Sequence, residues 1–356
     1  TREDGDAVML GKSFKIVEPR RFDLYIDDLV CASDEALVKI EYAAICKADL
    51  RYYLGARDKR TLGFKYPMNL LHEAVGTVIL DKTNSFHGGD RVVLVPNIIP
   101  KIRHECAHCV CARADLGENY CPNSFFASSN YNGFAREYAN YPVAYLLKVP
   151  ENLQPQVAVF TELISVAISA YRRLNLNGDE AIGVWGDGVL GYILSTTLRH
   201  IHRKGKIVVV GKDEDKLRQF KAHAHYQAGD PKIREEDLEV AYECVGGPFS
   251  AGAINEIIDK ISVGGSIVLT GVAENPVEIN TRKILEKGLS LYGVTRSNQR
   301  DFAKALTLFE KKEFQEEISR LILDELTIND ITDFYRAFEG ELENKRLGKN
   351  ILRFNL

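Results

Sequence analysis

Short apolar runs alternate with turn-forming residues over roughly the first quarter of the chain. Residues 37–42 and, more loosely, 76–80 alternate apolar and polar side chains with a period of two, and 90–95 forms another apolar run. This period is typical of strands with one buried face. The pattern predicts a compact β-rich domain, interrupted by a polar, cysteine-bearing segment at about 100–132.

From about residue 155 helical periodicity alternates with short apolar runs. This alternation is typical of a parallel, doubly wound sheet. The expected elements are a helix at 157–174, a strand at 181–185, a helix at 192–204, a strand at 206–210, further strand–helix pairs to about 294, helices near 301–310 and 331–342, and a strand at 350–354.

Three glycines in the pattern G-x-G-x-x-G (Gly186, Gly188 and Gly191) lie between the first of these strands and its helix, with Asp187 at the first x. Glycine permits a tight turn and lets backbone N–H groups approach a pyrophosphate at a helix N-terminus. An ordinary glycine turn would contain the same residues, but here strand, turn, helix and second strand follow in the order that a dinucleotide-binding unit requires. We therefore predict that this turn binds a dinucleotide.

The composition narrows the class of protein. At 356 residues the chain is long for one core, so two domains are expected. A net charge of −4 gives no basic excess for nucleic acid, and no apolar run approaches the roughly 18 residues that span a membrane. The N-terminus has no signal-peptide core. Four of the seven cysteines lie between 106 and 121, which suits metal binding in a reducing cytosol, so a cytoplasmic location is expected.

Cys46 and His72 are candidate metal ligands. Cys46 follows a predicted strand, and His72, with Glu73 beside it, precedes one. Thiolate, imidazole and carboxylate groups bind zinc, and a catalytic site uses three ligands and keeps a fourth position open. A single cysteine is more often a small buried side chain and a single histidine a structural one. The residues alone therefore leave the metal undecided.

The motif C-x-x-D at 46–49, the motif H-E-x-x-G at 72–76 and the later G-D-G-V-L-G resemble the zinc-dependent medium-chain alcohol and polyol dehydrogenases, over about 14–354. The resemblance implies an α/β protein with a GroES-like β-rich catalytic domain and a doubly wound, parallel-sheet Rossmann domain. The implied division is a catalytic domain at 1–163 (1–10 a tail or linker, 100–132 a cysteine-rich lobe), a Rossmann domain at 164–297 and a C-terminal segment at 298–356 that returns to the catalytic domain.

The resemblance also implies a catalytic zinc. Cys46 and His72 match the ligands of the family, and Glu162 stands where polyol dehydrogenases carry a glutamate that binds zinc directly or through water. Glu73 is the alternative ligand. Asp49 is expected to orient His72 from behind, as carboxylates do at metal-bound histidines.

Four further cysteines resemble the structural-zinc lobe of the same family, where a closed tetrahedral site pins a loop that has little core of its own. Only one residue separates the second and third cysteines, against two in the family. Either His104 or His108 then replaces one thiolate, or the site is empty. The four candidates are Cys106, Cys109, Cys111 and Cys121.

The strand that follows the glycine turn runs into Gly211 and Lys212. Enzymes that use NAD usually carry an acidic residue at this strand end, where it bonds the ribose 2′-hydroxyl. A glycine followed by a cation favours a 2′-phosphate and predicts NADPH. The alternative is a shift of one or two residues, with Asp213 in the acidic role and NAD as the cofactor.

One residue departs from the alcohol and polyol dehydrogenases. Ala48 stands where they generally carry Ser or Thr, whose hydroxyl passes the substrate proton toward solvent. Alanine has no hydroxyl. The proton is therefore expected to travel through metal-bound water and Glu162, or to come from another donor such as Tyr52.

A narrower resemblance, carried by 46–58, 66–73, 185–188, 280–282 and 285–302, is to the ribulose-5-phosphate reductases. It implies zinc-assisted, NADPH-dependent reduction of D-ribulose 5-phosphate to D-ribitol 5-phosphate, which supplies CDP-ribitol for teichoic acid and capsule synthesis. A phosphorylated sugar needs cations at the cleft, and arginine binds phosphate with paired hydrogen bonds. The first candidate is Arg51, and Arg296 is expected to line the cleft from the far side. Arg57 and Arg60 are weaker candidates, because a charge run such as 57–60 is usually a solvated loop.

Two other functions stay open at this point. The chain could be an NAD(P)-dependent zinc dehydrogenase of an unphosphorylated polyol or alcohol, or a non-catalytic binding protein on the same fold. The resemblance also implies a homodimer or tetramer. Because the sequence begins with Thr1, a processed form or a fusion with a cytidylyltransferase is a further possibility.

Overall fold

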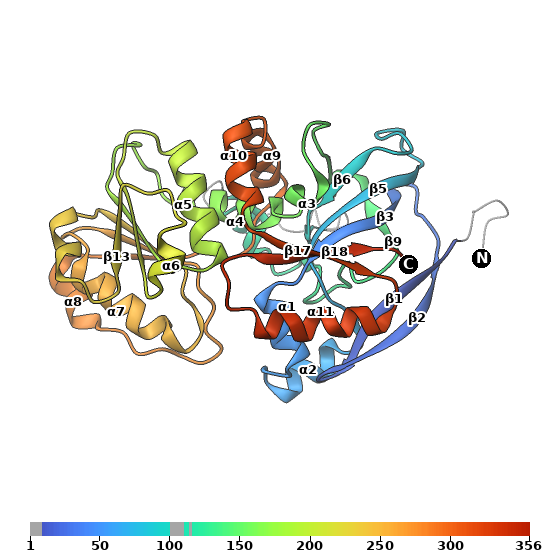
Figure 1. Ribbon diagram of the computed structural model, residues 1–356, viewed down its shortest axis with the longest axis horizontal. Helices are drawn as coiled ribbons and strands as arrows, with labels where there is room; N and C mark the ends of the chain where they lie inside the picture. The colour runs from blue at the N-terminus through green and yellow to red at the C-terminus, as the bar shows by residue number, and fades with distance from the viewer. Residues whose placement is uncertain (1–8, 100–109, 114–115) are drawn as a thin grey trace.

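The computed structural model describes residues 9–99, 110–113 and 116–356. It has two parts that lie side by side, a β-rich half and a half built on one parallel sheet (Figure 1). This arrangement confirms the predicted α/β class. Near-continuous apolar segments form the parallel strands because both faces of that sheet are covered by other elements.

The β-rich half contains a seven-stranded sheet and a three-stranded sheet. The main path of the larger sheet runs β10-β6-β5-β3-β18-β17, with β9 also paired to β3, and the smaller sheet runs β2-β1-β4. The strands of this half are β1 (Met9–Glu18), β2 (Arg21–Leu29), β3 (Glu35–Ala44), β4 (Met68–Asn69), β5 (Glu73–Asp81), β6 (Arg91–Leu94), β7 (Asn97–Ile98), β8 (Phe125–Phe126), β9 (Tyr138–Pro142), β10 (Leu146–Lys148), β17 (Ile322–Ile328) and β18 (Lys349–Phe354).

The other half is a six-stranded sheet in which every pair is parallel, in the order β13-β12-β11-β14-β15-β16. The order reverses at β11, and doubly wound sheets bind dinucleotides at such a reversal, outside the carboxyl ends of the strands. The strands are β11 (Ile182–Trp185), β12 (Ile207–Gly211), β13 (Ala224–Gln227), β14 (Val240–Glu243), β15 (Ser266–Leu269) and β16 (Ser290–Gly293).

The helices cover these sheets and connect the two halves (Figure 1). Three short 3₁₀ turns also matter below: η1 (Val110–Ala112), η2 (Gly117–Tyr120) and η5 (Gly247–Phe249). The α-helices are α1 (Lys47–Tyr53), α2 (Lys59–Lys65), α3 (Pro155–Ala158), α4 (Thr161–Arg172), α5 (Val189–Ile201), α6 (Glu214–Leu217), α7 (Ser250–Lys260), α8 (Thr281–Lys287), α9 (Gln299–Leu308), α10 (Lys312–Ser319) and α11 (Ile331–Glu343).

The single helix expected at 157–174 is wrong, because the structure has α3 and α4 with a break at 159–160. The Thr161 hydroxyl donates to the carbonyl of Ala158 at 2.6 Å, and the amide of Phe160 bonds three residues back to Val157. Side-chain bonds of this kind compete with the helical ladder. The break starts a new helix, and it places Glu162 in the first turn of α4.

The last part of the chain returns to the β-rich half, and there the sequence pattern missed α10 and β17. Strand β18 pairs antiparallel with β3 and parallel with β17, so it completes the seven-stranded sheet (Figure 1). Helix α11 packs against β2, β17 and β18. The position of β18 matters for the site because its first residue, Lys349, is almost fully buried.

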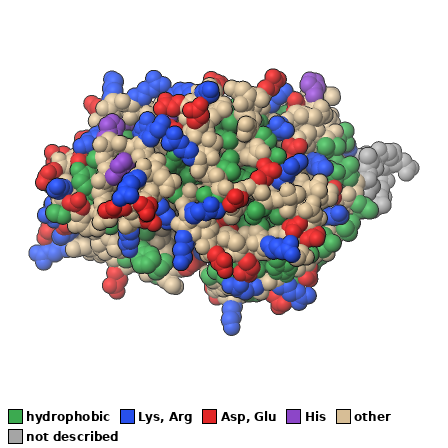
Figure 2. Space-filling model, in the orientation of Figure 1, with side chains coloured by type: hydrophobic (Ala, Val, Ile, Leu, Met, Phe, Trp, Pro, Cys, Tyr) green, Lys and Arg blue, Asp and Glu red, His purple; other side chains and the backbone are tan. Residues whose placement is uncertain are grey.

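Buried apolar side chains form one cluster inside the β-rich half and two that sandwich the parallel sheet, one of which extends into the β-rich half. On the face shown in Figure 2, acidic and basic side chains are interspersed. Of the helices in the described residues, none is long and apolar enough to cross a membrane.

Candidate active site

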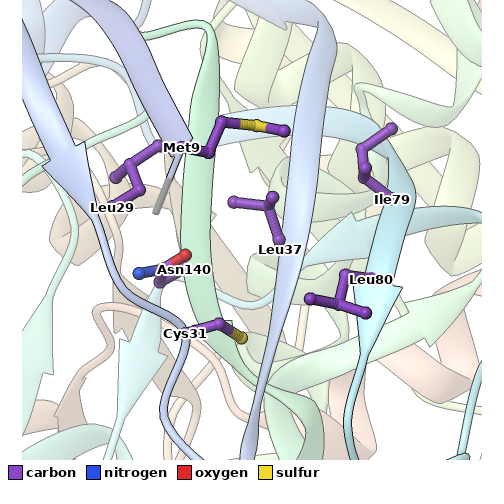
Figure 3. A pocket seen from close by; sticks show the side chains of 7 residues that line it. All are labelled: Met9, Leu29, Cys31, Leu37, Ile79, Leu80 and Asn140. Atoms are coloured by element: carbon purple, nitrogen blue, oxygen red, sulfur yellow. The ribbon is translucent and has the colours of Figure 1, made fainter. Parts of the chain in front are cut away.

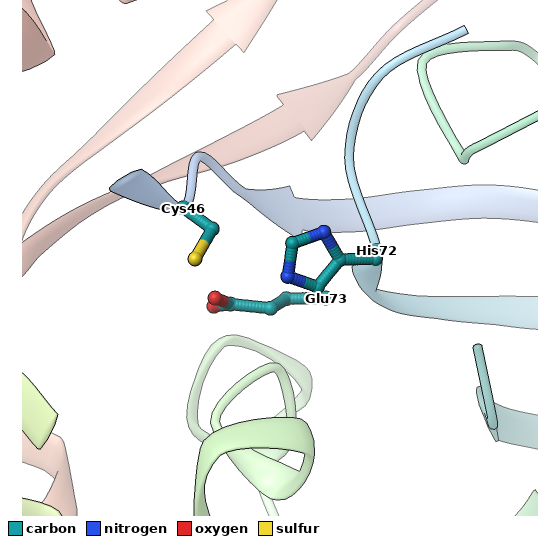
Figure 4. Close-up of side chains that lie close together, drawn as sticks. All are labelled: Cys46, His72 and Glu73. Atoms are coloured by element: carbon teal, nitrogen blue, oxygen red, sulfur yellow. The ribbon is translucent and has the colours of Figure 1, made fainter. Parts of the chain in front are cut away.

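Cys46, His72 and Glu73 form the group of potential metal ligands in the described residues. One ligand atom from each lies within 4.8 Å of the others. Cys46 caps the N-terminus of α1 just after β3, whereas His72 and Glu73 stand at the start of β5. Because β3 and β5 are paired, the end of one strand and the start of the other bring the three side chains together (Figure 4).

Asp49 ties the two ligand-bearing segments to each other. It is fully buried, and one of its carboxylate oxygens accepts from the amide of Cys46 at 2.8 Å. The other oxygen accepts from the amide of Leu71 at 3.0 Å and from the hydroxyl of Ser128 at 2.5 Å, and it lies 3.8 Å from His72 Nδ1. Asp49 therefore fixes the backbone on both sides of the ligand group, a positioning role broader than the one predicted.

Two properties of the ligand group, an unpaired buried nitrogen and a buried thiol, are those of a site that binds a cation. The Nδ1 atom of His72 is buried and has no hydrogen-bond partner, and orphaned buried nitrogen atoms are rare. Burial raises the pKa of the Cys46 thiol to about 12 in the metal-free protein. A bound metal would satisfy an imidazole nitrogen and stabilise the thiolate. The residues present therefore fit a zinc ion.

Glu73 already has a partner. Both of its carboxylate oxygens accept from Lys349 Nζ, at 2.6 and 2.7 Å, and both side chains are buried. The adjacent carboxylate raises the pKa of Lys349 above its ordinary value, although burial opposes the rise. The sequence analysis did not identify Lys349, because only the pairing of β18 with β3 brings it to the site.

Glu162 approaches the same group from α4 but lies outside the set of three ligand atoms. It is 5% exposed. Burial raises its pKa to about 8; His72 opposes the rise, whereas Glu73 and Cys46 add to it. Glu162 thus interacts electrostatically with all three candidate ligands. Glu73 is paired with Lys349, whereas Glu162 makes no ion pair in the described part of the chain.

The cysteine-rich lobe is described only in part. Cys106, Cys109, His104 and His108 lie outside the described residues. Cys111 lies in η1 and Cys121 is buried directly after η2. The second zinc site therefore stays a prediction.

The glycine turn has the geometry that a dinucleotide site needs. Gly186 has a φ of 130°, and a Cβ on Gly191 would lie 1.9 Å from the carbonyl oxygen of Gly186, so neither position accepts a side chain. Gly188 caps α5 at its N-terminus, and a Cβ there would meet nothing within 4 Å. The tight turn at Gly186 and Gly191, together with the open space at Gly188, allows a ligand to approach the N-terminus of α5.

Asp187 holds the segment that follows β12. Its Oδ2 atom accepts from the amides of Lys212 and Asp213, at 2.6 and 2.8 Å. A Cβ on Gly211 would lie 2.6 Å from the Cβ of Asp187, so Asp187 fills the space that an acidic side chain at this strand end would use. Lys212 extends over the ring of Phe249, 4.1 Å from its centre. Sequence spacing alone did not indicate this role for Asp187.

Two of the candidate phosphate-binding arginines have no acidic partner in the described residues. Arg296, at a φ of 61°, donates to Ser124 Oγ at 2.9 Å and lies 4.8 Å from the ring of Phe126, which in turn packs 5.6 Å from the ring of His72. Burial lowers the pKa of Arg296. Arg57 lies over the ring of Tyr52, and its Nε is buried without a hydrogen-bond partner.

Arg51, the first candidate, already makes an ion pair. Its Nε lies 2.6 Å from Oε1 of Glu274, a residue of the other half of the molecule. Arg60, the weakest candidate, is exposed on α2. The pairing of Arg51 with Glu274 was not foreseen from the sequence, because the two residues are far apart along the chain.

The apolar pocket shown in Figure 3 belongs to a different part of the β-rich half. Its lining includes Leu29, Leu37, Ile79 and Leu80, with Asn140 as the polar exception. It contains none of the candidate ligands or arginines. The sugar phosphate expected from the sequence would need charged partners, which the described lining of this pocket does not supply.

Comparison with known proteins shows which family the sequence and the fold resemble. The model of the alcohol dehydrogenase GroES-like domain matches residues 32–151. The chain is 36% identical to the ribulose-5-phosphate reductase of Bacillus spizizenii, over 98% of this chain and 100% of the relative. It is 36% identical to ribulose-5-phosphate reductase 1 of Staphylococcus aureus, over 97% and 99%. The crystal structure of S. aureus TarJ in complex with NADPH superimposes with a TM-score of 0.84 at 32% identity, covering 98% of this chain and 100% of that one.

Proposed function

The chain belongs to the ribulose-5-phosphate reductase family, within the dehydrogenases that carry a GroES-like domain, and on this premise we propose that it reduces D-ribulose 5-phosphate to D-ribitol 5-phosphate with NADPH. The observation that carries the proposal is the identity of more than a third over essentially the full length of these relatives. The neighbouring structure, TarJ, was solved with NADPH.

In the proposed site, Cys46 and His72 would hold a zinc ion, with Glu162 as the third protein group. Glu73 is assigned a supporting role because Lys349 occupies both of its carboxylate oxygens. When bound, zinc would polarise the substrate carbonyl and offset the negative charge that develops on its oxygen. Asp49 keeps the two ligand-bearing segments at a fixed separation, so the substrate carbonyl meets a preorganised site.

NADPH is proposed to lie along the glycine turn, with its pyrophosphate at the N-terminus of α5. The open space at Gly188 admits the phosphate oxygens, and the positive end of the helix attracts them. Lys212 is the candidate partner of the 2′-phosphate. The chain contributes placement and charge, whereas the hydride belongs to the cofactor.

The substrate phosphate is assigned to the arginines near α1. Arg296 is the strongest candidate, because it is partly buried, has no acidic partner in the described residues and packs against the ring of Phe126, which in turn packs against His72. Arg57, over the ring of Tyr52, and Arg51, paired with Glu274, are the further candidates. A phosphate with paired hydrogen bonds to such groups would orient the sugar chain toward the ligand group.

Because Ala48 has no hydroxyl, two residues compete as the proton donor. Glu162 interacts electrostatically with the ligand group, and Tyr52 is buried on α1. Glu162→Gln and Tyr52→Phe separate them: the variant that lowers kcat while both zinc content and NADPH binding stay unchanged identifies the donor. A homo-oligomer and a cytidylyltransferase partner stay predictions.

The direct test is NADPH consumption with D-ribulose 5-phosphate, compared with NADH and with D-ribulose. Turnover that requires both NADPH and the phosphate supports the proposal. Equal turnover of D-ribulose would point instead to a dehydrogenase of unphosphorylated polyols. Cys46→Ser should lose zinc, measured by elemental analysis, and lose activity while it retains NADPH affinity. Full turnover by Cys46→Ser would rule out the metal assignment.

A further inference from the structure

The ion pair between Arg51 and Glu274 joins the two halves of the molecule. Arg51 lies on α1, the helix that Cys46 caps, and Glu274 lies in the segment between β15 and α8 of the parallel-sheet half. The side chains are 22% and 32% exposed, so water screens the pair only in part. The contact thus connects the ligand group to a segment at the carboxyl end of the parallel sheet.

The pair is close but poorly aligned. Arg51 Nε lies 2.6 Å from the carboxylate, yet this buried nitrogen has no hydrogen-bond partner of acceptable angle. Guanidinium groups bind most strongly through two parallel hydrogen bonds to one anion. Glu274 therefore neutralises Arg51 without forming a well-aligned hydrogen bond to its Nε atom. An anion that forms two parallel hydrogen bonds to the guanidinium group would replace Glu274.

Two further arginines approach the helix that carries Arg51. Arg57 and Arg296 are the other two candidate phosphate groups, and neither makes an ion pair within the described ranges. Both approach Tyr52, the next residue along α1 from Arg51: Arg57 lies 4.6 Å from its ring centre, and Arg296 interacts with it electrostatically. Of these three guanidinium groups, only that of Arg51 has an acidic partner in the described part of the chain, and that partner is Glu274.

The segment that carries Glu274 is anchored at its start. Glu243, fully buried at the end of β14, accepts from the amides of Val245, Gly246 and Gly271, at 2.9, 2.7 and 3.1 Å. A Cβ on Gly271 would lie 2.6 Å from that carboxylate, so this part of the backbone is held in place. Glu274 stands three residues beyond the anchor and can leave Arg51 without displacing it.

We propose that Glu274 occupies Arg51 in place of the substrate phosphate and is displaced by it, which makes Glu274 a specificity-determining residue. A sugar phosphate carries about 1.5 to 2 negative charges near pH 7 and three acceptor oxygens, against one charge on a carboxylate. It outcompetes Glu274 for Arg51, whereas a neutral sugar does not. The site thereby rejects unphosphorylated sugars at the cost of some affinity for the phosphorylated one. This inference rests on the proposed function.

The test compares Glu274→Gln with Glu278→Gln, a control in the same segment whose side chain makes no ion pair in the described residues. Inorganic phosphate is titrated into each zinc- and NADPH-loaded protein by calorimetry. Glu274→Gln should bind phosphate about fivefold more tightly than the wild type, the effect of removing one partly screened ion pair. Glu278→Gln should match the wild type.

Three readouts separate this role from a structural one. In an Arg51→Gln background, Glu274→Gln should no longer tighten phosphate binding, because the competition needs both residues. The Kd for NADPH should be the same in all variants, and KM for D-ribulose 5-phosphate should fall in Glu274→Gln. Unchanged phosphate affinity in Glu274→Gln, or tightening that persists without Arg51, overturns the proposal. Since phosphate binding needs no turnover, the titration reports on Glu274 even where D-ribulose 5-phosphate is not the substrate.

Discussion

Replacing Gly211 by aspartate should abolish tight cofactor binding rather than convert the protein to NADH. An acidic residue at this strand end is the usual signature of NAD enzymes. Here a Cβ at position 211 would lie 2.6 Å from the Cβ of Asp187 and 2.7 Å from its Oδ2. Real Cβ atoms do not approach so closely, so either Asp187 or the strand end must move.

The electrostatic cost adds to the steric one. Two carboxylates held about 4 Å apart repel by about 4 kcal/mol at an effective dielectric constant near 20, equivalent to roughly a 1,000-fold change in an equilibrium constant. The new carboxylate also competes for the amides of Lys212 and Asp213, which Asp187 now occupies. The repulsion lowers the stability of the folded protein and displaces the segment after β12, which would hold the adenosine end of the cofactor.

Trp185, the single tryptophan, ends β11 just before the glycine turn and provides a fluorescence signal for titration with each cofactor. In Gly211→Asp the Kd should rise at least tenfold for NADPH, with no gain for NADH. Gly211→Ala isolates the steric part, because it adds a Cβ without charge. The double variant Gly211→Asp, Asp187→Gly should restore binding, now with NADH preferred. A switch to NADH in Gly211→Asp alone would refute the reasoning.

Three further variants test the site and its frame. Arg296→Ala should raise KM for D-ribulose 5-phosphate at least tenfold and leave the Kd for NADPH unchanged; an unchanged KM would remove Arg296 from the phosphate site. Lys349→Met leaves the buried carboxylate of Glu73 unpaired and should lower the free energy of unfolding of the metal-free protein by about 3–5 kcal/mol. The loss should be smaller with zinc bound, because the positive ion then stabilises the same carboxylate. Thermal unfolding with and without zinc measures both losses, and equal losses would contradict this electrostatic coupling. Glu317 is 1% exposed and pairs with Lys221, Arg199 and His200, interactions that hold its pKa at about 2 against the burial that opposes them. Glu317→Gln should therefore lower the free energy of unfolding by about 3 kcal/mol at pH 7, the linkage expected when a carboxyl pKa is held this far below its ordinary value. Because the folded pKa lies below the unfolded one, this stabilisation is complete above about pH 4.5 and disappears as the pH falls toward 2, so the wild-type and variant unfolding curves should converge in acid. Glu313→Gln, at an exposed position of the same helix, should change little.

Local pattern predicted the elements whose partners are near in sequence. The period of two at 37–42 corresponds to β3, and the glycine turn lies between β11 and α5 as its spacing indicated. The fold class followed from these elements. The break between α3 and α4 escaped prediction because apolar periodicity continues across it, while one Thr161 hydroxyl redirects the backbone.

The parts of the site that the sequence did not indicate depend on contacts between distant segments. A lysine is ordinarily exposed, and nothing in its neighbours predicts that Lys349 is buried against Glu73. Glu274 likewise stands directly before Asn275 and Pro276, a pair typical of a turn, and nothing there indicates a distant partner. Asp187 fits its motif equally well as a solvent-facing residue, and only the distance to Gly211 gives it a specific role.

The pairing of Glu73 with a lysine 276 positions later has a consequence for the order of assembly. During synthesis Cys46, His72 and Glu73 leave the ribosome long before Lys349. Until β18 joins β3, Glu73 has no ammonium group from that strand, and its carboxylate is open to a metal ion. The nascent chain therefore offers three donors, and the docking of β18 withdraws one of them. The last strand to be made thus decides whether Glu73 is a free carboxylate or one half of a buried ion pair.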